Sequence, residues 1–222
     1  MENLVENISK SVAIELLFEE MPTRPTVNAI FREARKIFGD INIINRDEND
    51  IEFSVDKFVA YNEDNTTSPV VLAMGNITDF DDKVAVSEFE RTQIWNVANS
   101  EELLSKYKYA VKIWDVNAQR QIPKERAIML VDWLNVALKL YPKCQAIWIK
   151  SAGKLQLAQS IKNLKETGIV KYLYSMVNIR FFNVPNTNEF IVDSVGLANI
   201  GLSDVQFHFK GMNPNKIANL AY

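Results

Sequence analysis

The chain has 222 residues, of which 47% are apolar, 10% aromatic and 24% charged, a composition typical of globular proteins. A chain of this length buries roughly 70% of its unfolded surface, so it forms a core without disulfides or metals. The formal net charge of −3 argues against general nucleic-acid binding, and no apolar run reaches the ~18 residues that a membrane helix needs. The composition therefore excludes fibrous, disulfide-framework, membrane-spanning and strongly basic classes.

Two features of the sequence bear on the cellular compartment. The first residues, MENLVENISKS, carry acids and lack a basic start followed by an apolar run, so we expect no secretory signal. The single Cys144 has no second cysteine with which to form an internal disulfide, which fits a reducing environment. We therefore expect a cytoplasmic protein.

The charge is divided unevenly along the chain. Residues 1–106 hold 10 Lys and Arg against 21 Asp and Glu, whereas residues 107–222 hold 15 against 7. One interpretation is that an acidic lobe and a basic lobe dock on each other. The alternative is that the acidic or the basic face attracts a protein partner, because fields of this size steer association.

The first half begins with a strand followed by a helix. Residues 12–18 alternate between apolar and other side chains, which predicts a strand. Residues 27–38 place their apolar side chains on one helical face, with Thr23 as the predicted N-cap and Gly39 as the left-handed C-terminal residue. Further strands are predicted at residues 41–44, 51–55 and 70–74, around the polar runs NRDEND and NEDNTTSP.

A helical connector is predicted over residues 86–106, with a break around residues 96–100. Ser100 would cap its second helix. The connector is too apolar to be left in water, because it contains Phe89, Ile94, Trp95, Leu103 and Leu104.

The second half repeats the order of strand, helix and further strands. A strand is predicted at 109–116, a helix at 123–141, a buried strand at 146–149 and a weaker helix at 155–166. Three more strands follow at 175–182, 190–195 and 205–209, and Asn213-Pro214-Asn215 opens a last helix. We predict an α+β fold of two related lobes, residues 1–106 and 107–222, and the shared order suggests an internal duplication.

The sequence contains none of the common catalytic or metal-binding motifs. The sequence has no glycine-rich phosphate loop and no GxSxG elbow, and one Cys with one His cannot hold zinc. We therefore predict neither a metal site nor a cofactor. Cys144 is predicted to be buried, residues 151–154 to form a loop between strand and helix, and the four tryptophans to lie in the core: Trp95, Trp114, Trp133 and Trp148.

The candidate site lies near the C-terminus. In residues 205–209 the alternation turns Val205, Phe207 and Phe209 inward and leaves Gln206 and His208 on the other face. One hypothesis is a polar pocket that binds a ligand and is formed by Asp193, Asp204, His208, Asn213 and Asn215. The alternative is that Asp204 and the asparagines cap turns while His208 is half-buried in a hydrogen bond.

The same segment contains the runs VNIRFFN, IVDSVGL and DVQFHFKGMNPN, the last followed by the predicted helix. In these runs the chain resembles an uncharacterised bacterial family, domain-of-unknown-function family 4261. Weaker similarity extends upstream through TQIWNVANSEELLSKYKYAVKIWD, KERAIMLVDWL and YPKCQAIWIKSAGK, so that the resemblance covers roughly residues 90–222. It implies a bacterial, cytoplasmic protein and no activity that can be carried over.

Three classes of function follow from these observations. The first is a non-enzymatic interaction or accessory protein that acts through its surface, without general nucleic-acid or membrane binding. The second is a hydrolase using His208 with Asp193 or Asp204, and the third is a small-ligand sensor using the same C-terminal pocket. A deep cleft around His208 would favour the enzyme or the sensor, and a flat surface would favour the interaction protein.

Overall fold

The computed structural model describes residues 11–46, 49–64 and 66–221. Residues 1–10, for which we expect no secretory signal, lie outside the described residues, as do parts of the NRDEND and NEDNTTSP loops.

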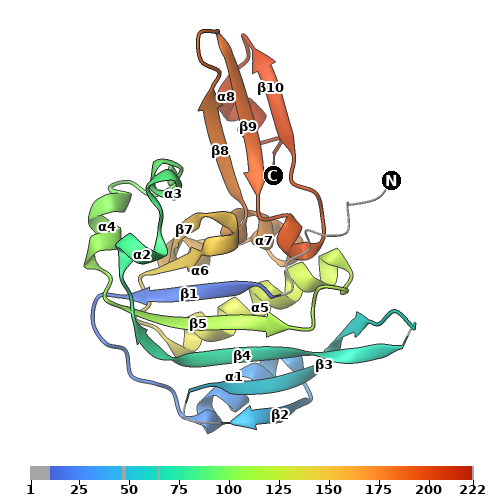
Figure 1. The fold of residues 1–222 in the computed structure, drawn as a ribbon. Helices are drawn as coiled ribbons and strands as arrows, with labels where there is room; N and C mark the ends of the chain where they lie inside the picture. Colours follow the sequence, from blue (N-terminus) through green and yellow to red (C-terminus); the bar gives the residue numbers. More distant parts are fainter. Residues whose placement is uncertain (1–10, 47–48, 65, 222) are drawn as a thin grey trace.

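Within the described residues, seven strands form one antiparallel sheet in the order β2-β3-β4-β5-β1-β6-β7 (Figure 1). The first strand lies in its interior, because Leu16 is opposite Val111 on one side and Ile147 on the other. The strands are β1 (Ala13–Phe18), β2 (Ile41–Arg46), β3 (Ile51–Tyr61), β4 (Thr67–Asp79), β5 (Tyr109–Val116), β6 (Ala146–Ile149) and β7 (Lys154–Leu157).

One face of this sheet carries the main core. Trp133, fully buried, meets the rings of Phe38 and Phe53 edge-on at centroid distances of 6.4 and 5.3 Å. Leu16 belongs to this core, whereas the neighbouring Leu17 belongs to a second core, since successive strand residues point to opposite faces. The main core is covered by α1 (Val27–Phe38), α5 (Pro123–Leu140) and α7 (Gly168–Met176), and α6 (Ala158–Asn163) follows β7.

The second core lies under the helical connector. Leu17 and Trp148 from the sheet pack there with Ile94 and Leu104 of the connector. The connector contains two short helices, α3 (Glu88–Thr92) and α4 (Ser100–Lys106), and is preceded by another short helix, α2 (Asp82–Ala85). Its predicted burial is therefore confirmed for Ile94 and Leu104 and wrong for two aromatic residues, Phe89 and Trp95, whose exposed fractions are 55% and 51%.

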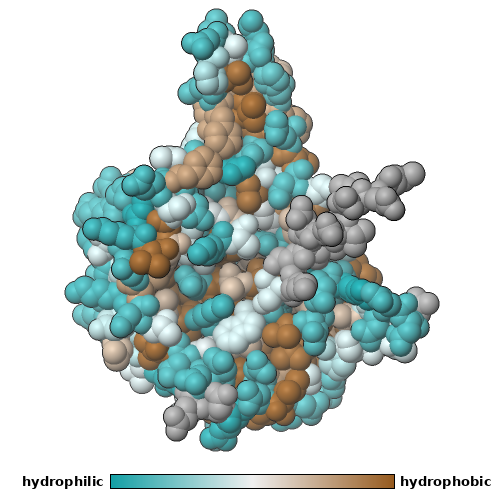
Figure 2. Space-filling model, viewed as in Figure 1, coloured by the Kyte–Doolittle hydropathy of each residue, from teal (hydrophilic) through white to brown (hydrophobic). Residues whose placement is uncertain are grey.

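A second, three-stranded antiparallel sheet projects from the seven-stranded sheet and its helices (Figures 1 and 2). Its inner face packs Val192 and Phe209 against Ile217. We call residues 178–196 and 205–221 the arm, and the rest of the described chain the body. The arm contains β8 (Asn178–Asn183), β9 (Glu189–Val195), β10 (Gln206–Lys210) and α8 (Pro214–Ala218).

The arm joins the body at its base through close contacts. The hydroxyl of Tyr172 donates to the carbonyl of Gly196 at 2.7 Å, and Asn178 Nδ2 donates to the carbonyl of Gly153 at 2.9 Å. Gly196 has φ +126°, and a Cβ there would lie 2.9 Å from the carbonyl oxygen of Met176. Only glycine fits at this point of the joint.

The α+β class predicted from the sequence is confirmed, but the halves of the chain are not separate packing units. The expected boundary at residues 106/107 falls between β4 and β5, which are hydrogen-bonded neighbours in one sheet. The duplication is not confirmed, because β6 lies beside β1 in the interior of the sheet whereas its counterpart β2 lies at the edge.

Several element boundaries differ from the predictions. Thr26, not Thr23, caps α1 and accepts from the backbone N–H of Ala29. The predicted helix over residues 155–166 begins instead with strand β7, and α7 occupies residues for which no helix is predicted. For that reason β8 begins at Asn178 rather than at residue 175.

Candidate functional site

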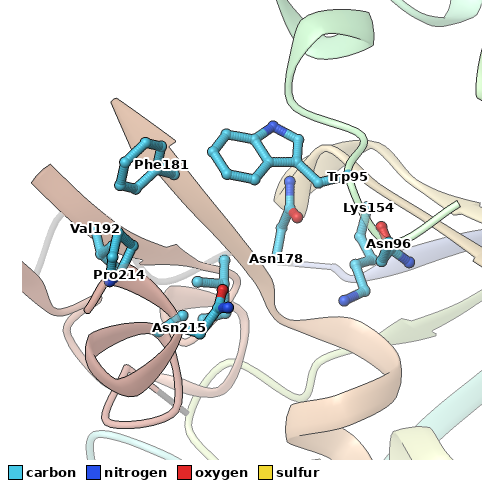
Figure 3. Close-up of a pocket in the computed structure, with 10 residues that line it drawn as sticks. Trp95, Asn96, Lys154, Asn178, Phe181, Val192, Pro214 and Asn215 are labelled. Carbon is cyan, nitrogen blue, oxygen red and sulfur yellow. The ribbon is translucent and has the colours of Figure 1, made fainter. Parts of the chain in front are cut away.

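A cavity of about 510 Å³ lies between the arm and the body (Figure 3). The body contributes residues from the connector and β7, and the arm contributes residues from β8, β9 and α8. The described residues that line it are Trp95, Asn96, Lys154, Asn178, Ile179, Phe181, Val192, Pro214, Asn215 and Ala218.

Two aromatic rings from opposite walls of the cavity meet. The ring of Trp95, from the connector, meets the ring of Phe181, from β8, at 5.4 Å with an interplanar angle of 73°. Trp95 Nε1 donates to the carbonyl of Thr92 at 3.1 Å, so the indole is held while half of the residue is exposed. The prediction that Trp95 is a core residue is wrong, whereas it is confirmed for the fully buried Trp133 and Trp148.

The polar part of the wall is held by hydrogen bonds from the body. Asn96 Nδ2 donates to the carbonyl of Leu155 at 2.8 Å and to Gln156 Oε1 at 2.6 Å. Asn178 is fixed by its bond to Gly153. Amide groups held in this way present their donors and acceptors to a ligand at fixed positions.

Lys154 is the charged side chain among the described residues that line the cavity. It follows Gly153, whose φ of +57° turns the chain from β6 into β7, and it lies opposite Ile149. Only 2% of Lys154 is exposed, and burial lowers the pKa of its amine to about 8. The side chain extends from β7 toward the arm (Figure 3).

A second cavity, of about 330 Å³, lies on the other side of Asn178. It is more strongly charged, since its lining includes Glu90, Lys150 and Arg180. Asn178 lines both cavities, so the base of β8 separates an apolar space from a charged one.

The predicted C-terminal residues have separate partners. His208 Nε2 lies 2.9 Å from Glu189 Oε2, and the His208 side chain is 55% exposed on the outer face of the arm sheet. Asp193 accepts from Arg180 Nε at 2.8 Å on the same face. The predicted inward orientation is confirmed for Phe207 and Phe209, while Val205 is exposed.

The side chains of Asp204 and Asn213 bond to backbone groups at turns beside the arm strands. Asp204 Oδ1 accepts from the backbone N–H of Leu197 at 2.9 Å, and Asn213 Oδ1 accepts from that of Asn215 at 2.9 Å to cap α8. Of the five predicted residues, Asn215 lines the cavity. The structure thus does not bring the five side chains into one pocket, and the capping roles match the structural alternative.

The sequence pattern does not indicate Lys154 or Asn178 as site residues, nor the exposure of Trp95. It places Lys154 in a loop, although the alternation in KLQL is a strand signal that points to β7. The prediction for Cys144 is confirmed: it is buried, its thiol contacts the carbonyl of Ala146 at 3.1 Å, and burial raises its pKa to about 12.

Comparisons of the sequence with protein-family models, with curated proteins and with solved structures found no match. The resemblance to domain-of-unknown-function family 4261 stays a prediction. Across the described ranges, no helix combines the length and apolar character of a membrane crossing. In the same part of the chain, no group of three or more His, Cys, Asp or Glu side chains is arranged to hold a metal ion.

Proposed function

We propose that the protein is a non-enzymatic accessory protein that binds a small organic ligand in the cavity between the arm and the body. The observation that carries this proposal is the cavity's two-sided lining, in which Trp95 and Asn96 come from the body and Phe181 and Asn215 from the arm. A concave, mainly apolar space with a few fixed polar groups is the usual form of a small-molecule site.

The arrangement also supports a sensor role. The arm contacts the body at its base, around Gly196 and Asn178, and Asn178 of this joint also lines the cavity. A ligand that touches both walls adds contacts between arm and body, and so favours one arm position over others. A partner that recognises the arm would then respond to the ligand.

The hydrolase alternative has less support. His208 is exposed and paired with Glu189, and Asp193 is bonded to Arg180, so neither is arranged to activate the other or a water molecule. The exposed setting of His208 favours the class of binding and interaction proteins. We expect the protein in the cytoplasm, because Cys144, its single cysteine, is a buried thiol.

The proposal is tested with 2-naphthol, a compact neutral aromatic probe, in a titration followed by ¹H–¹⁵N NMR. We expect the indole N–H of Trp95 and the side-chain amides of Asn96 and Asn178 to shift together. Trp95→Ala should weaken binding about fivefold, since a stacked aromatic contact contributes on the order of 1 kcal/mol.

Phe89→Ala is the matched control, because Phe89 is an equally exposed aromatic residue of the same connector but lines the second cavity. This variant should bind 2-naphthol as the unchanged protein does. Absence of shifts at the cavity, or equal weakening by both variants, would contradict the proposed site.

A further inference from the structure

We propose that the second cavity, which lies between α3, the turn at residues 150–153 and the base of β8, binds a free α-amino acid with a compact apolar side chain. Its volume of about 330 Å³ is near the lower end for small-molecule sites, so the occupant is small. This site is separate from the cavity of the proposed function, and the inference does not depend on that function.

The wall formed by α3 offers acceptors for an ammonium group. Glu90 and Gln93 are three residues apart along this segment, and both line the cavity. The backbone N–H and the hydroxyl of Ser87 both donate to Glu90 Oε2, at 2.8 and 2.6 Å. These bonds hold the carboxylate in place and leave its other oxygen, Oε1, to a ligand.

Gln93 shows that a donor is missing at this wall. Thr92 Oγ1 donates its proton to the carbonyl of Phe89 at 2.7 Å, so it can only accept from Gln93, and it does so from Nε2 at 3.1 Å. The other amide atom of Gln93 is therefore Oε1, which is buried and has no hydrogen-bond partner among the described residues. A buried acceptor without a partner is costly, and an N–H of a ligand would satisfy it.

The walls formed by the turn and by β8 offer cations for a carboxylate. Arg180 donates to Asp193 through Nε, at 2.8 Å, and through Nη2, which leaves Nη1 as a donor. Lys150 is exposed in the turn. Burial raises the pKa of Glu15, and Lys150 is near enough to oppose this effect, but the two side chains form no salt bridge. A carboxylate between Lys150 and Arg180 would receive charge-assisted hydrogen bonds.

The acidic and basic walls are close enough for one small zwitterion. Gly153 N–H donates to the carbonyl of Lys150 at 3.2 Å, so both belong to one tight turn. A Cβ at Gly153 would lie 3.8 Å from Cγ of Glu90, so this turn approaches α3 closely. A simple carboxylate would leave Glu90 without a cation, and a simple amine would leave Lys150 without an anion. A ligand with both groups on one carbon satisfies both walls.

The apolar part of the lining describes the side chain of the ligand. Phe89, Ala152 and Val195 line the same cavity, and Phe89 is 55% exposed. An apolar side chain that lies on the Phe89 ring removes apolar surface from water, which favours binding. A strongly charged side chain would gain nothing from this part of the lining.

Three probes of one shape test the inference on the full chain: L-leucine, 4-methylpentanoate, which lacks the amino group, and 3-methylbutylamine, which lacks the carboxylate. In a ¹H–¹⁵N NMR titration we expect L-leucine to shift the backbone amides of Ser151 and Gly153 and the side-chain amide of Gln93. It should bind at least about tenfold more tightly than either analogue, because each analogue loses one charged contact. The indole N–H of Trp95, in the first cavity, should not shift.

Two variants assign the contacts. Glu90→Gln removes the charge but keeps an acceptor for Ser87, since glutamine also forms a capping box, and it should abolish the preference for L-leucine over 4-methylpentanoate. Glu88→Gln, at an exposed acid of the same helix that lines neither cavity, is its control.

Lys150→Met should abolish the preference for L-leucine over 3-methylbutylamine. Lys165→Met, at an exposed lysine that lines neither cavity, should keep it. Both Glu90 and Lys150 are at least partly exposed, so neither change empties the core.

The unchanged protein decides the inference even if a variant does not fold. Equal affinity for the three probes, no shift at Ser151, Gly153 and Gln93, or a shift at Trp95 instead would overturn it. Equal effects of Glu90→Gln and Glu88→Gln would do the same. None of these results bears on the titration with 2-naphthol at the first cavity, so the two proposals fail separately.

Discussion

Individual ion pairs differ greatly in how much they contribute to the stability of this fold. Arg126 Nε donates to Asp115 Oδ2 at 2.9 Å, and both side chains are almost completely buried. Asp115 also accepts from the backbone N–H of Val12 at 2.6 Å, and so ties the start of β1 to β5. By contrast, the side chains of His208 and Glu189 are partly exposed to solvent.

We therefore expect Asp115→Ala to lower the free energy of unfolding by about 3–5 kcal/mol, because it leaves a buried guanidinium without its carboxylate. His208→Ala should lower it by less than about 1 kcal/mol, as exposed pairs do. Urea unfolding of both variants against the unchanged protein measures the two losses. Similar losses would mean that His208 has a structural role that its exposure does not indicate.

Among the elements, α1 and α5 are joined by a carboxylate. Glu33 of α1 lies 2.7 Å from Lys139 of α5 and 2.7 Å from Lys36 of its own helix. Hydrogen bonds from Lys139, and then from Lys36, lower the pKa of Glu33 to about 2. The bond to Lys139 also links the acidic first half of the chain to the basic second half, as do the pairs Glu63–Arg120 and Glu20–Lys143.

The lowered pKa of Glu33 predicts an acid-dependent stability. A carboxylate whose pKa is lower in the folded state stabilises the fold above its ordinary pKa near 4.5, and this contribution is lost as the pH falls toward about 2. The melting temperature of Glu33→Gln should therefore lie below that of the unchanged protein at pH 6, and the gap should narrow steadily between pH 4.5 and 2. Glu166→Gln, at an exposed acid, controls for the loss of a carboxylate. If the difference in melting temperature is the same at pH 6 and pH 3, the contacts of Glu33 with the lysines do not cause it.

The elements that could be predicted from the sequence are those in which one local pattern dominates. The strand β5 and the helix α1 have clear periodicity, and β6 is a continuous apolar run. Gly39 ends α1 with the positive φ that was predicted, +76°, but its ψ of −128° lies outside the left-handed helical region. The strand β7 is only four residues long, so its alternation is too short to compete with the helical pattern that follows. Helix α7 has apolar residues at helical spacing, Ile169, Tyr172, Leu173 and Met176, so the sequence does contain a local signal for this helix.

The candidate site could not be predicted in the same way. Trp95, Lys154 and Phe181 are far apart in the sequence and meet only because the arm stands over β7 and the connector. Lys154 in particular looks like an ordinary surface lysine next to a turn, and its burial comes from that tertiary arrangement. The prediction of a site near His208 joined polar residues that are close in the sequence, and closeness in the sequence does not determine which side chains share a face or a pocket.

For the whole molecule, the joint between arm and body decides whether the cavity keeps its shape. At Gly196 the backbone has φ +126° and leaves no space for a Cβ, whereas at Gly39, with φ +76°, a Cβ would meet no atom within 4 Å. We expect Gly39→Ala to cost about 1–2 kcal/mol of stability from backbone strain alone. Gly196→Ala should cost about 3 kcal/mol, because strain and the contact with Met176 add. Urea unfolding measures the loss of stability in both variants. Equal losses would mean that the backbone around Gly196 shifts at little cost to admit a Cβ.

The position of β1 in the interior of the main sheet has a consequence for how the protein is made. During synthesis Leu16 emerges before both of its sheet neighbours, and it has neither of them until Val111 and then Ile147 have left the ribosome. Closing such long loops is slow, and an apolar strand with both edges open attracts chaperones and other chains in the meantime. The segment Ala13–Phe18 therefore needs protection in the nascent chain, although in the finished protein it is among the best buried.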